Sequence, residues 1–283
     1  MATTLMADYE VREEFCSLDE WRTWHPQHPE ISSLEVRTAV LEAIRAEGYH
    51  DPVSDGRADP TRIEIGTDLR EGILYCGLNS RMRAVWVEML RIQTAAEIPD
   101  QELRVFAPEA LTDFALRLRG KYRFFLGSEY MPTAAERNAF FPIQHQDLQK
   151  LTFPDGSFHV IVCNEVFEHV PDIDASLGEL CRVLKPGGAL VGTFPFCFHD
   201  QESLIRARLR PDGSVEHLTA PEYHGNPVDP ESGALVFEIP GWNILDRANR
   251  SGFKRARMVL VGSRQSGVLA EAINGVMIMV AER

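Results

Sequence analysis

From about residue 103 onward, short apolar runs alternate with segments in which apolar positions recur every three or four residues. The apolar runs predict strands at 103–106, 122–129, 142–147, 158–165, 189–196, 256–262 and 274–282, and the periodic segments predict helices at 108–119, 174–184 and 242–253. Continuous apolar strands that alternate with helices form a parallel sheet covered on both faces. The last two strands have little helix between them, which predicts an antiparallel pair at one sheet edge.

The first hundred residues follow a different pattern. Ser32–Gly48 has helical spacing, with Ser33 as a candidate N-cap and Gly48 as a stop, and Asn79–Gln93 forms a second such segment. We therefore expect residues 1–100 to be a mainly helical accessory segment. The α/β domain would span 101–283, with a loop-rich insertion at about 197–240.

Composition narrows the class of protein. No apolar run approaches the roughly 18 residues of a membrane helix, and the start of the chain lacks the pattern of a secretory signal, so we expect a cytoplasmic protein without membrane contact. The net charge of −13 disfavours nucleic acid, and the basic group at Arg206, Arg208 and Arg210 is interpreted as a solvated helix face. An oligomer is possible but not indicated.

The carboxyl ends of the predicted strands are where an open α/β sheet binds its ligand. The first strand is followed by Ala107-Pro108-Glu109, where a nucleotide-binding fold normally has glycines. Pro108 suits the first position of a helix, and Glu109 suits the positive end of its dipole. This pattern predicts a helix that begins at Pro108, and a well-started helix alone would also explain it.

Later strand ends carry further polar groups. Glu129, about 20 residues past the first turn and followed by Tyr130, can accept hydrogen bonds from both hydroxyls of a ribose, although a surface glutamate is an equal alternative. Asp147 can accept from an exocyclic amine, with Leu148 packing on the ring. The next strand end places Asn164, Glu165, Glu168 and His169 around a strand-to-helix turn.

Two long stretches give these signals a specific order. The segments DLQKLTFPDGSFHVIVCNEVFEHVPD (147–172) and ELCRVLKPGGALVGTFPF (179–196) resemble the class I S-adenosylmethionine-dependent methyltransferases with a type 11-like methyltransferase domain. The resemblance covers about residues 103–283 and implies a Rossmann-like sheet, S-adenosyl-L-methionine as cofactor and a small-molecule acceptor. Whether oxygen or nitrogen is methylated stays open.

The glycine-free turn is similar to a subset of this class with Ala-Pro-Glu at that place. The subset also has a cysteine pair upstream, and YCGLNSRMRAVW (75–86) matches it in part, with Ile73 at the earlier cysteine position. One cysteine cannot form a zinc knuckle, and the five cysteines show no metal-ligand spacing, so we expect no metal. S-adenosylmethionine has no phosphate, so the small Ala107 would suffice where a pyrophosphate needs glycines.

The resemblance also implies roles for individual residues. The residues expected to bind the cofactor are Ala107, Pro108, Glu109, Glu129, Tyr130, Asp147, Leu148, Asn164 and Glu165. Among them, Glu109 would face the ligand's ammonium group. The catalytic candidates are His169, Glu165, Tyr223 and His224, the last two from the insertion. His169 could equally be a capping or packing histidine. Arg81 and Arg83 could contact an acidic acceptor or form surface salt bridges.

Two other functions stay open. A methyltransferase-like binding or scaffold protein without catalysis would explain the glycine-free turn. A nicotinamide dehydrogenase is disfavoured, because no G-x-G-x-x-G follows the first strand.

Overall fold

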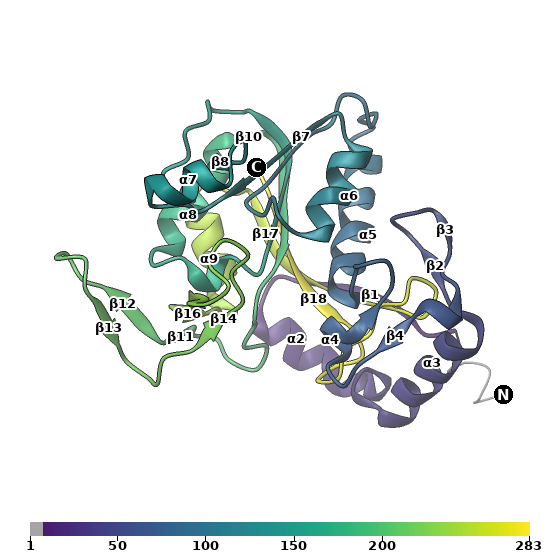
Figure 1. Ribbon diagram of the computed structural model, residues 1–283. Helices are drawn as coiled ribbons and strands as arrows, with labels where there is room; N and C mark the ends of the chain where they lie inside the picture. Colours follow the sequence, from purple (N-terminus) through teal and green to yellow (C-terminus); the bar gives the residue numbers. More distant parts are fainter. Residues whose placement is uncertain (1–7) are drawn as a thin grey trace. The chain divides into compact units, whose positions relative to one another are not determined.

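The computed structural model describes residues 8–283, which form two compact units (Figure 1). The first unit contains the described residues up to Ala95 together with Arg257–Met279, and the second contains Ala96–Ala256 and Val280–Arg283. Among these described residues no helix is both long and apolar enough to span a bilayer.

The first unit is built from helices and short strands. Its elements are β1 (Glu10–Phe15), α2 (Leu18–Trp24), α3 (Leu34–Glu47), β2 (His50–Asp51), β3 (Gly56–Arg57), β4 (Glu64–Ile65), α4 (Leu69–Gly72), β5 (Ile73–Leu74), α5 (Ser80–Ala95) and most of β17 (Arg255–Ser263) and β18 (Val276–Glu282). Ser33 caps α3 as predicted, by accepting from the backbone N–H of Val36. The strand β1 was not predicted, and it pairs antiparallel with β17.

The second unit alternates strands and helices. Its elements are β6 (Arg104–Ala107), α6 (Asp113–Lys121), β7 (Phe124–Glu129), α7 (Ala134–Ala139), β8 (Gln144–His145), β9 (Phe158–Asn164), α8 (Ile173–Val183), β10 (Leu184–Thr193), β11 (Leu204–Ile205), β12 (Ala207–Leu209), β13 (Val215–His217), β14 (Tyr223–His224), β15 (Ala234–Leu235), β16 (Glu238–Ile239) and α9 (Asn243–Arg250). Figure 1 shows α8 and α9 on one side of its central strands and α6 on the other.

The central strands of the second unit lie in the order β10-β9-β6-β7-β8, and all four pairings are parallel. The end of β18 joins this sheet through Arg283, whose backbone exchanges hydrogen bonds with Gly187 and Gly188 at the start of β10. Gly187 has φ of +80°, a conformation that favours glycine and explains the Pro-Gly-Gly turn in the sequence. The predicted mostly parallel α/β sheet with an antiparallel edge is confirmed.

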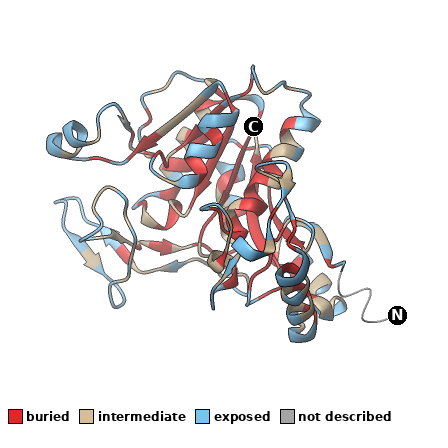
Figure 2. Cartoon of the chain, turned by 45° about the vertical axis from the view of Figure 1, so that its right-hand side comes forward, coloured by how far each residue is buried: buried red, intermediate tan, exposed pale blue. Residues whose placement is uncertain are grey.

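Apolar side chains of the parallel strands form the core, and the strands are coloured as buried in Figure 2. Phe106, Ile161 and Leu190 have no exposed surface. Burial of each side chain of this size stabilises the fold by about 1.5–3 kcal/mol. The rigid core therefore fixes the positions of the strand ends, where the polar candidates lie.

The first helix of this unit begins later than the sequence predicts. Thr112 is the N-cap, and its hydroxyl accepts from the backbone N–H of Ala115, so α6 starts at Asp113. The prediction that the helix begins at Pro108, with Glu109 in its first turn, is wrong. A threonine side chain can accept a helix N–H and a proline side chain cannot, so the cap sits at Thr112 and the preceding residues form a loop.

The insertion after β10 contains three short antiparallel strand pairs, β11 with β16, β12 with β13 and β14 with β15. The β12–β13 pair extends away from the other strands of its unit (Figures 1 and 2). Arg208 lies on β12, between Arg206 and Arg210, so the interpretation of this basic group as a helix face is wrong. The backbone N–H of Phe237 donates to the carbonyl of Glu168 at 2.7 Å, which ties the insertion to the segment after β9.

Candidate functional site

Three of the predicted site residues, Glu109, Glu129 and Asn164, lie where the parallel strands end. The strand register sets Ala107 of β6 beside Gly127 of β7, and Asn164 of β9 beside Thr193 of β10. The first loop, the end of β7 and the end of β9 therefore share one edge of the sheet. We call this the carboxyl edge.

Glu129 supports the first loop from the end of β7. Its Oε1 accepts from the backbone N–H groups of Ala110 at 2.7 Å and Leu111 at 3.0 Å. The residue is only 9% exposed, and burial raises its pKa while the two backbone hydrogen bonds oppose that shift. Because Oε1 is occupied, Oε2 is the oxygen that remains for a ligand.

Glu109 and Asn164 are joined directly across the carboxyl edge. Asn164 Nδ2 donates to Glu109 Oε1 at 2.8 Å, and the Thr112 hydroxyl donates to Glu109 Oε2 at 2.9 Å. Thr193 Oγ1 lies 3.4 Å from Asn164 Oδ1 on the other side. Glu109 and Asn164 are both buried, so these hydrogen bonds fix the carboxylate of Glu109 in one orientation.

Glu165 has a strained backbone that the sequence did not reveal. Its φ is +51°, which costs about 1–2 kcal/mol in a residue with a β-carbon. Its backbone N–H donates to the carbonyl of Thr193 at 2.7 Å, which holds the strained conformation. Such strain is concentrated at functional sites, because it persists only where the surroundings enforce it.

The remaining cofactor candidates lie along the same edge. Asp147 is half-buried, and its Oδ1 accepts from the backbone N–H of Gln149 at 2.9 Å, while Leu148 beside it is buried. Tyr130 is 60% exposed, and its ring lies 5.6 Å from that of His145. Ala107 is buried at the end of β6, with Pro108 directly after it. Ala107 is thus a buried residue directly before the first loop, and Tyr130 has the largest exposed fraction of these residues.

Two of the catalytic candidates are brought together by a residue that was not assigned a role. Glu168 is completely buried, and its Oε1 lies 3.6 Å from His169 Nε2 and 3.6 Å from His224 Nδ1. The two imidazole rings are 5.1 Å apart and nearly perpendicular. Tyr223, by contrast, is 56% exposed. The adjacent Glu168-His169 pair was the sequence signal for this grouping, but its partner His224 lies in the insertion, far along the chain.

The charges around His224 favour its protonated form. The carboxylate of Glu168 raises the pKa of His224 most, burial opposes it, and Glu222 raises it further. Glu222 Oε1 lies 3.2 Å from His224 Nε2. His224 is therefore held between two carboxylates.

The two arginines of α5, Arg81 and Arg83, bind partners within the protein and do not face a methyl acceptor. Arg83 has no exposed surface and donates to the carbonyls of Ile73, Leu78 and Gly267, so neither alternative, contact with an acidic acceptor or a surface salt bridge, holds for it. A buried guanidinium needs these partners, and they use its donors. Arg81 forms an ion pair with Glu71, the salt bridge named as the alternative, although Arg81 itself is buried.

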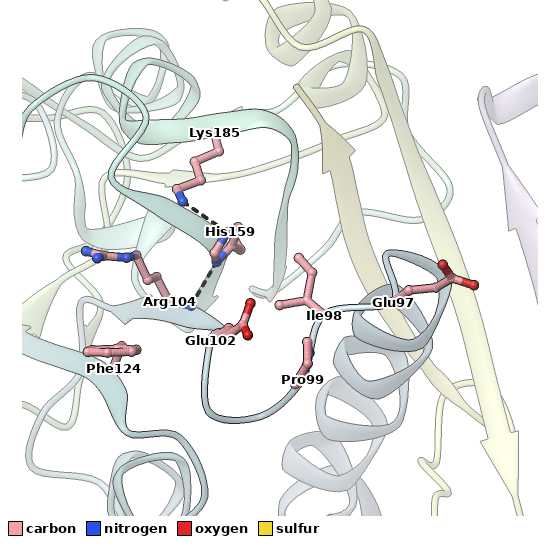
Figure 3. Close-up of a pocket in the computed structure, with 8 residues that line it drawn as sticks. All are labelled: Glu97, Ile98, Pro99, Glu102, Arg104, Phe124, His159 and Lys185. Carbon is pink, nitrogen blue, oxygen red and sulfur yellow. Dashed lines mark hydrogen bonds between the residues drawn. The ribbon is translucent and has the colours of Figure 1, made fainter.

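A separate pocket lies at the opposite, amino edge of the same strands (Figure 3). It has a volume of about 350 Å³ and is lined by Glu97, Ile98, Pro99, Glu102, Arg104, Phe124, His159 and Lys185. His159 Nδ1 accepts from the backbone N–H of Arg104 at 2.9 Å, and its Nε2 lies 3.1 Å from Lys185 Nζ. No sequence-predicted site residue lines this pocket, and ligands of open α/β sheets bind at the other edge.

The carboxyl edge fits a ligand with hydroxyl and amine donors and no phosphate. Glu109 and Glu129 flank the first loop with two buried carboxylates, which would repel a pyrophosphate. Glu129 Oε2 and the carboxylate of Asp147 can accept from hydroxyl or amine groups. These are the groups that S-adenosylmethionine presents, so the residues suit this cofactor.

The strand arrangement is that of a Rossmann-like class I fold, and the chemistry of the carboxyl edge suits S-adenosyl-L-methionine as its cofactor. Residues 120–192 match the family model described as "Methyltransferase domain". This stretch contains the ends of β7 and β9, so it includes Glu129 and Asn164.

Relatives match over short stretches. The chain is 51% identical over 45 residues to the 2-methyl-6-phytyl-1,4-hydroquinone methyltransferase of Synechocystis, covering 16% of this chain and 14% of that one. It is 32% identical over 89 residues to the demethylmenaquinone methyltransferase of Deinococcus radiodurans, covering 28% of this chain and 37% of that one. The chain thus spans well under half the length of these relatives.

Among solved structures, an S-adenosylmethionine-dependent methyltransferase from Mesorhizobium loti aligns with a TM-score of 0.42 and 16% identity. The alignment covers 69% of this chain and 97% of that one.

Proposed function

We propose that this protein transfers a methyl group from S-adenosylmethionine to a small-molecule acceptor, with residues 101–283 carrying catalysis and residues 1–100 as an accessory segment. The observation that carries the proposal is the joined set of Glu109, Asn164 and Glu129 at the carboxyl edge, with one carboxylate oxygen of Glu129 left for a ligand. The two relatives are named for small organic substrates, which supports an acceptor of that kind.

The cofactor side of the site is formed by the ends of β6, β7 and β9. Bound S-adenosylmethionine supplies an already activated methyl group, so the protein contributes mainly position. In this proposal Glu129 accepts from the ribose hydroxyls, Asp147 accepts from the adenine amine, and Glu109 binds the ammonium group. The hydrogen bonds from Asn164 and Thr112 hold the Glu109 carboxylate for that contact.

The acceptor side lies between the turn after β9 and the insertion. An acceptor that loses a proton needs a base within hydrogen-bond reach. Glu165 and His169 come from the turn, and Tyr223 and His224 come from β14. Tyr223 is the most exposed of the four, so we assign it to acceptor contact rather than proton transfer.

Equilibrium binding of S-adenosylhomocysteine, measured by calorimetry, tests this proposal. Glu129→Gln keeps an oxygen that can accept from the first loop but replaces the second acceptor by a donor. We expect the unmodified protein to bind one equivalent and Glu129→Gln to bind about 10- to 100-fold more weakly. Glu102→Gln, at the amino edge of the same sheet, is the matched control and should bind normally. Absence of saturable binding by the unmodified protein would refute the proposal.

A binding or scaffold protein without catalysis is the second candidate. The observation that favours it is that both carboxylate oxygens of Glu109 already accept hydrogen bonds within the protein. Such a protein would bind S-adenosylhomocysteine but form none from S-adenosylmethionine with any acceptor. Turnover with a panel of phenols, quinols and amines, read as S-adenosylhomocysteine formed, separates the two candidates.

A further inference from the structure

The side chain of Glu168 is buried without hydrogen bonds to its carboxylate in the part of the chain that the structure describes. It has no exposed surface, and neither carboxylate oxygen has a hydrogen-bond partner among the described residues. A carboxylate removed from water and left without hydrogen bonds costs several kcal/mol, so native proteins place a positive charge beside it. Either a protonated His224 or a bound cation can supply this charge beside Glu168.

Two imidazole nitrogens face this carboxylate. The ligand atoms of Glu168, His169 and His224 all lie within 4.8 Å of one another. A tetrahedral ion with bonds of about 2.0–2.1 Å holds its ligand atoms about 3.4 Å apart. The two histidine nitrogens are each 3.6 Å from Glu168 Oε1, so small side-chain movements would reach that spacing.

The outer nitrogen of each ring is already fixed by an acceptor. His169 Nδ1 lies 2.9 Å from the carbonyl oxygen of Leu235, and His224 Nε2 lies 3.2 Å from Glu222 Oε1. A carbonyl and a carboxylate can only accept, so the hydrogen of each neutral ring is on the outer nitrogen. The lone pairs of His169 Nε2 and His224 Nδ1 are then directed toward Glu168. Metal-ligating histidines have this arrangement, in which a carbonyl or carboxylate orients the ring.

The backbone holds the three residues together from two segments. Glu168 and His169 belong to the short helical turn Phe167–His169, and His224 belongs to β14. β14 pairs with β15, which contains Leu235, and this pairing sets Tyr223 beside Leu235. The insertion thus supplies one ligand and both outer acceptors.

We propose that Glu168, His169 and His224 bind a divalent transition metal of the zinc class. Two imidazoles and one carboxylate are ligands that zinc accepts, whereas magnesium prefers oxygen ligands and water. Three protein ligands leave a fourth position open. The side chain of His224 is 32% exposed, so this position can be reached from solvent. The site departs from the expectation of no metal. A histidine that binds the metal cannot also take a proton from the acceptor, so with metal bound the role of base would be left to Glu165.

Calorimetric titration of chelator-treated protein with Zn²⁺ tests the proposal. We expect one Zn²⁺ per chain, with binding weakened at least about tenfold in Glu168→Gln and in His224→Gln. His217→Gln is the matched control, because His217 is exposed on β13 of the same insertion, and its affinity should be unchanged. All of these variants carry Cys16→Ser and Cys76→Ser in addition, since these two exposed thiols could bind zinc themselves. We call the protein with only these two changes the background protein.

Thermal unfolding supplies an independent readout. At the same Zn²⁺ concentration, the unfolding temperature should rise by the same amount in the background protein and in His217→Gln, and by clearly less in His224→Gln. If Glu168→Gln fails to fold, the partly exposed His224 still provides the test. The proposal is overturned if the background protein binds no Zn²⁺, or if His224→Gln binds it with unchanged affinity. Either result would leave a metal-free ion pair between Glu168 and His224.

Discussion

The two edges of the parallel sheet in the second unit place polar side chains in opposite ways. At the carboxyl edge, Glu109, Glu129 and Asn164 are almost completely buried, and hydrogen bonds fix their orientation. At the amino edge, a cavity of about 350 Å³ is lined by Arg104, His159 and Lys185 together with exposed acids. The carboxyl edge contains the buried charges, and the amino edge contains the open volume.

The difference shows which property marks a site. A surface hollow costs the fold little, because its polar groups remain in contact with water. Left-handed backbone occurs at both edges, at Glu165 and at Glu97, so it does not separate them. Buried carboxylates cost free energy and persist only where the surroundings stabilise them. In our proposal, function lies at the carboxyl edge, and the predictions below compare changes there with matched changes elsewhere.

The largest expected effect is from Asn164→Asp. The new carboxylate would face Glu109 across the 2.8 Å hydrogen bond that it replaces, and we expect a loss of about 3 kcal/mol in the free energy of unfolding at pH 7. Acidification should restore part of the loss, because one proton shared by the pair removes the repulsion. Urea denaturation measures both.

Asn243→Asp is the matched control for this change. Asn243 Nδ2 donates to Glu202 Oε2 at 2.9 Å in an exposed pair, so the same substitution should cost less than about 1 kcal/mol. If the two substitutions lowered the free energy of unfolding equally, burial of the Glu109–Asn164 pair would make no additional contribution to its stability.

Thr112→Val should have the next largest effect. It removes the hydroxyl that caps α6 and that donates to Glu109 Oε2, while it keeps the side-chain volume. We expect a loss of about 1–2 kcal/mol in the free energy of unfolding. Thr38→Val, on an exposed position of α3, should change it by less than about 0.5 kcal/mol. A loss at Thr112 no greater than at Thr38 would argue against the cap.

Glu165→Gly separates stability from activity. Glycine adopts the φ of +51° without strain, so the free energy of unfolding should stay unchanged or rise by up to about 1 kcal/mol, while methyl transfer falls. Glu42→Gly, inside α3, should instead lose about 1 kcal/mol. Destabilisation at Glu165 as large as at Glu42 would mean that its backbone is not strained.

Acidic pH should weaken cofactor binding through Glu129. Burial raises the pKa of its carboxyl above the usual 4.5, and the protonated form offers one acceptor fewer to a ligand hydroxyl. Affinity for S-adenosylhomocysteine should therefore fall as the pH drops through this raised pKa, by up to about tenfold per pH unit. In Glu129→Gln the same fall should be absent, and a flat profile in the unmodified protein would contradict the assignment.

The smallest effect is expected at the amino edge. Burial, together with the charges of Lys185 and Arg104, lowers the pKa of His159 below 6.5. The unfolded chain then binds the proton more readily than the folded one, so stability is lost as the pH falls below 6.5. His159→Gln should remove this small dependence and leave cofactor binding unchanged. Impaired binding would move the functional edge to the other end of the strands.

Much of the fold could be predicted because it depends on local periodicity. The parallel strands and their helices follow from apolar runs and repeats within single segments, and Ser33 could be recognised as a cap from its neighbours alone. The strand β1 could not, because it has mixed burial and its pairing with β17 joins residues about 250 positions apart. The start of α6 was predicted too early, because proline at Pro108 was a weaker signal than the side-chain cap of Thr112.

The candidate site was predictable at the strand ends and not beyond them. Topology brings Glu109, Glu129 and Asn164 to one edge of any parallel sheet with this strand order. The contact of Glu168 with His224 depends on how the insertion folds back, which no local pattern encodes. The burial of Arg83 likewise depends on carbonyls contributed by distant segments.

A crystal structure with S-adenosylhomocysteine tests the central claim most directly. We predict that the ribose hydroxyls lie within hydrogen-bond distance of Glu129 and that the amino-acid end lies at the loop containing Glu109. Density for the ligand in the pocket of Arg104, His159 and Lys185, with Glu129 and Asp147 turned away from it, would contradict the account.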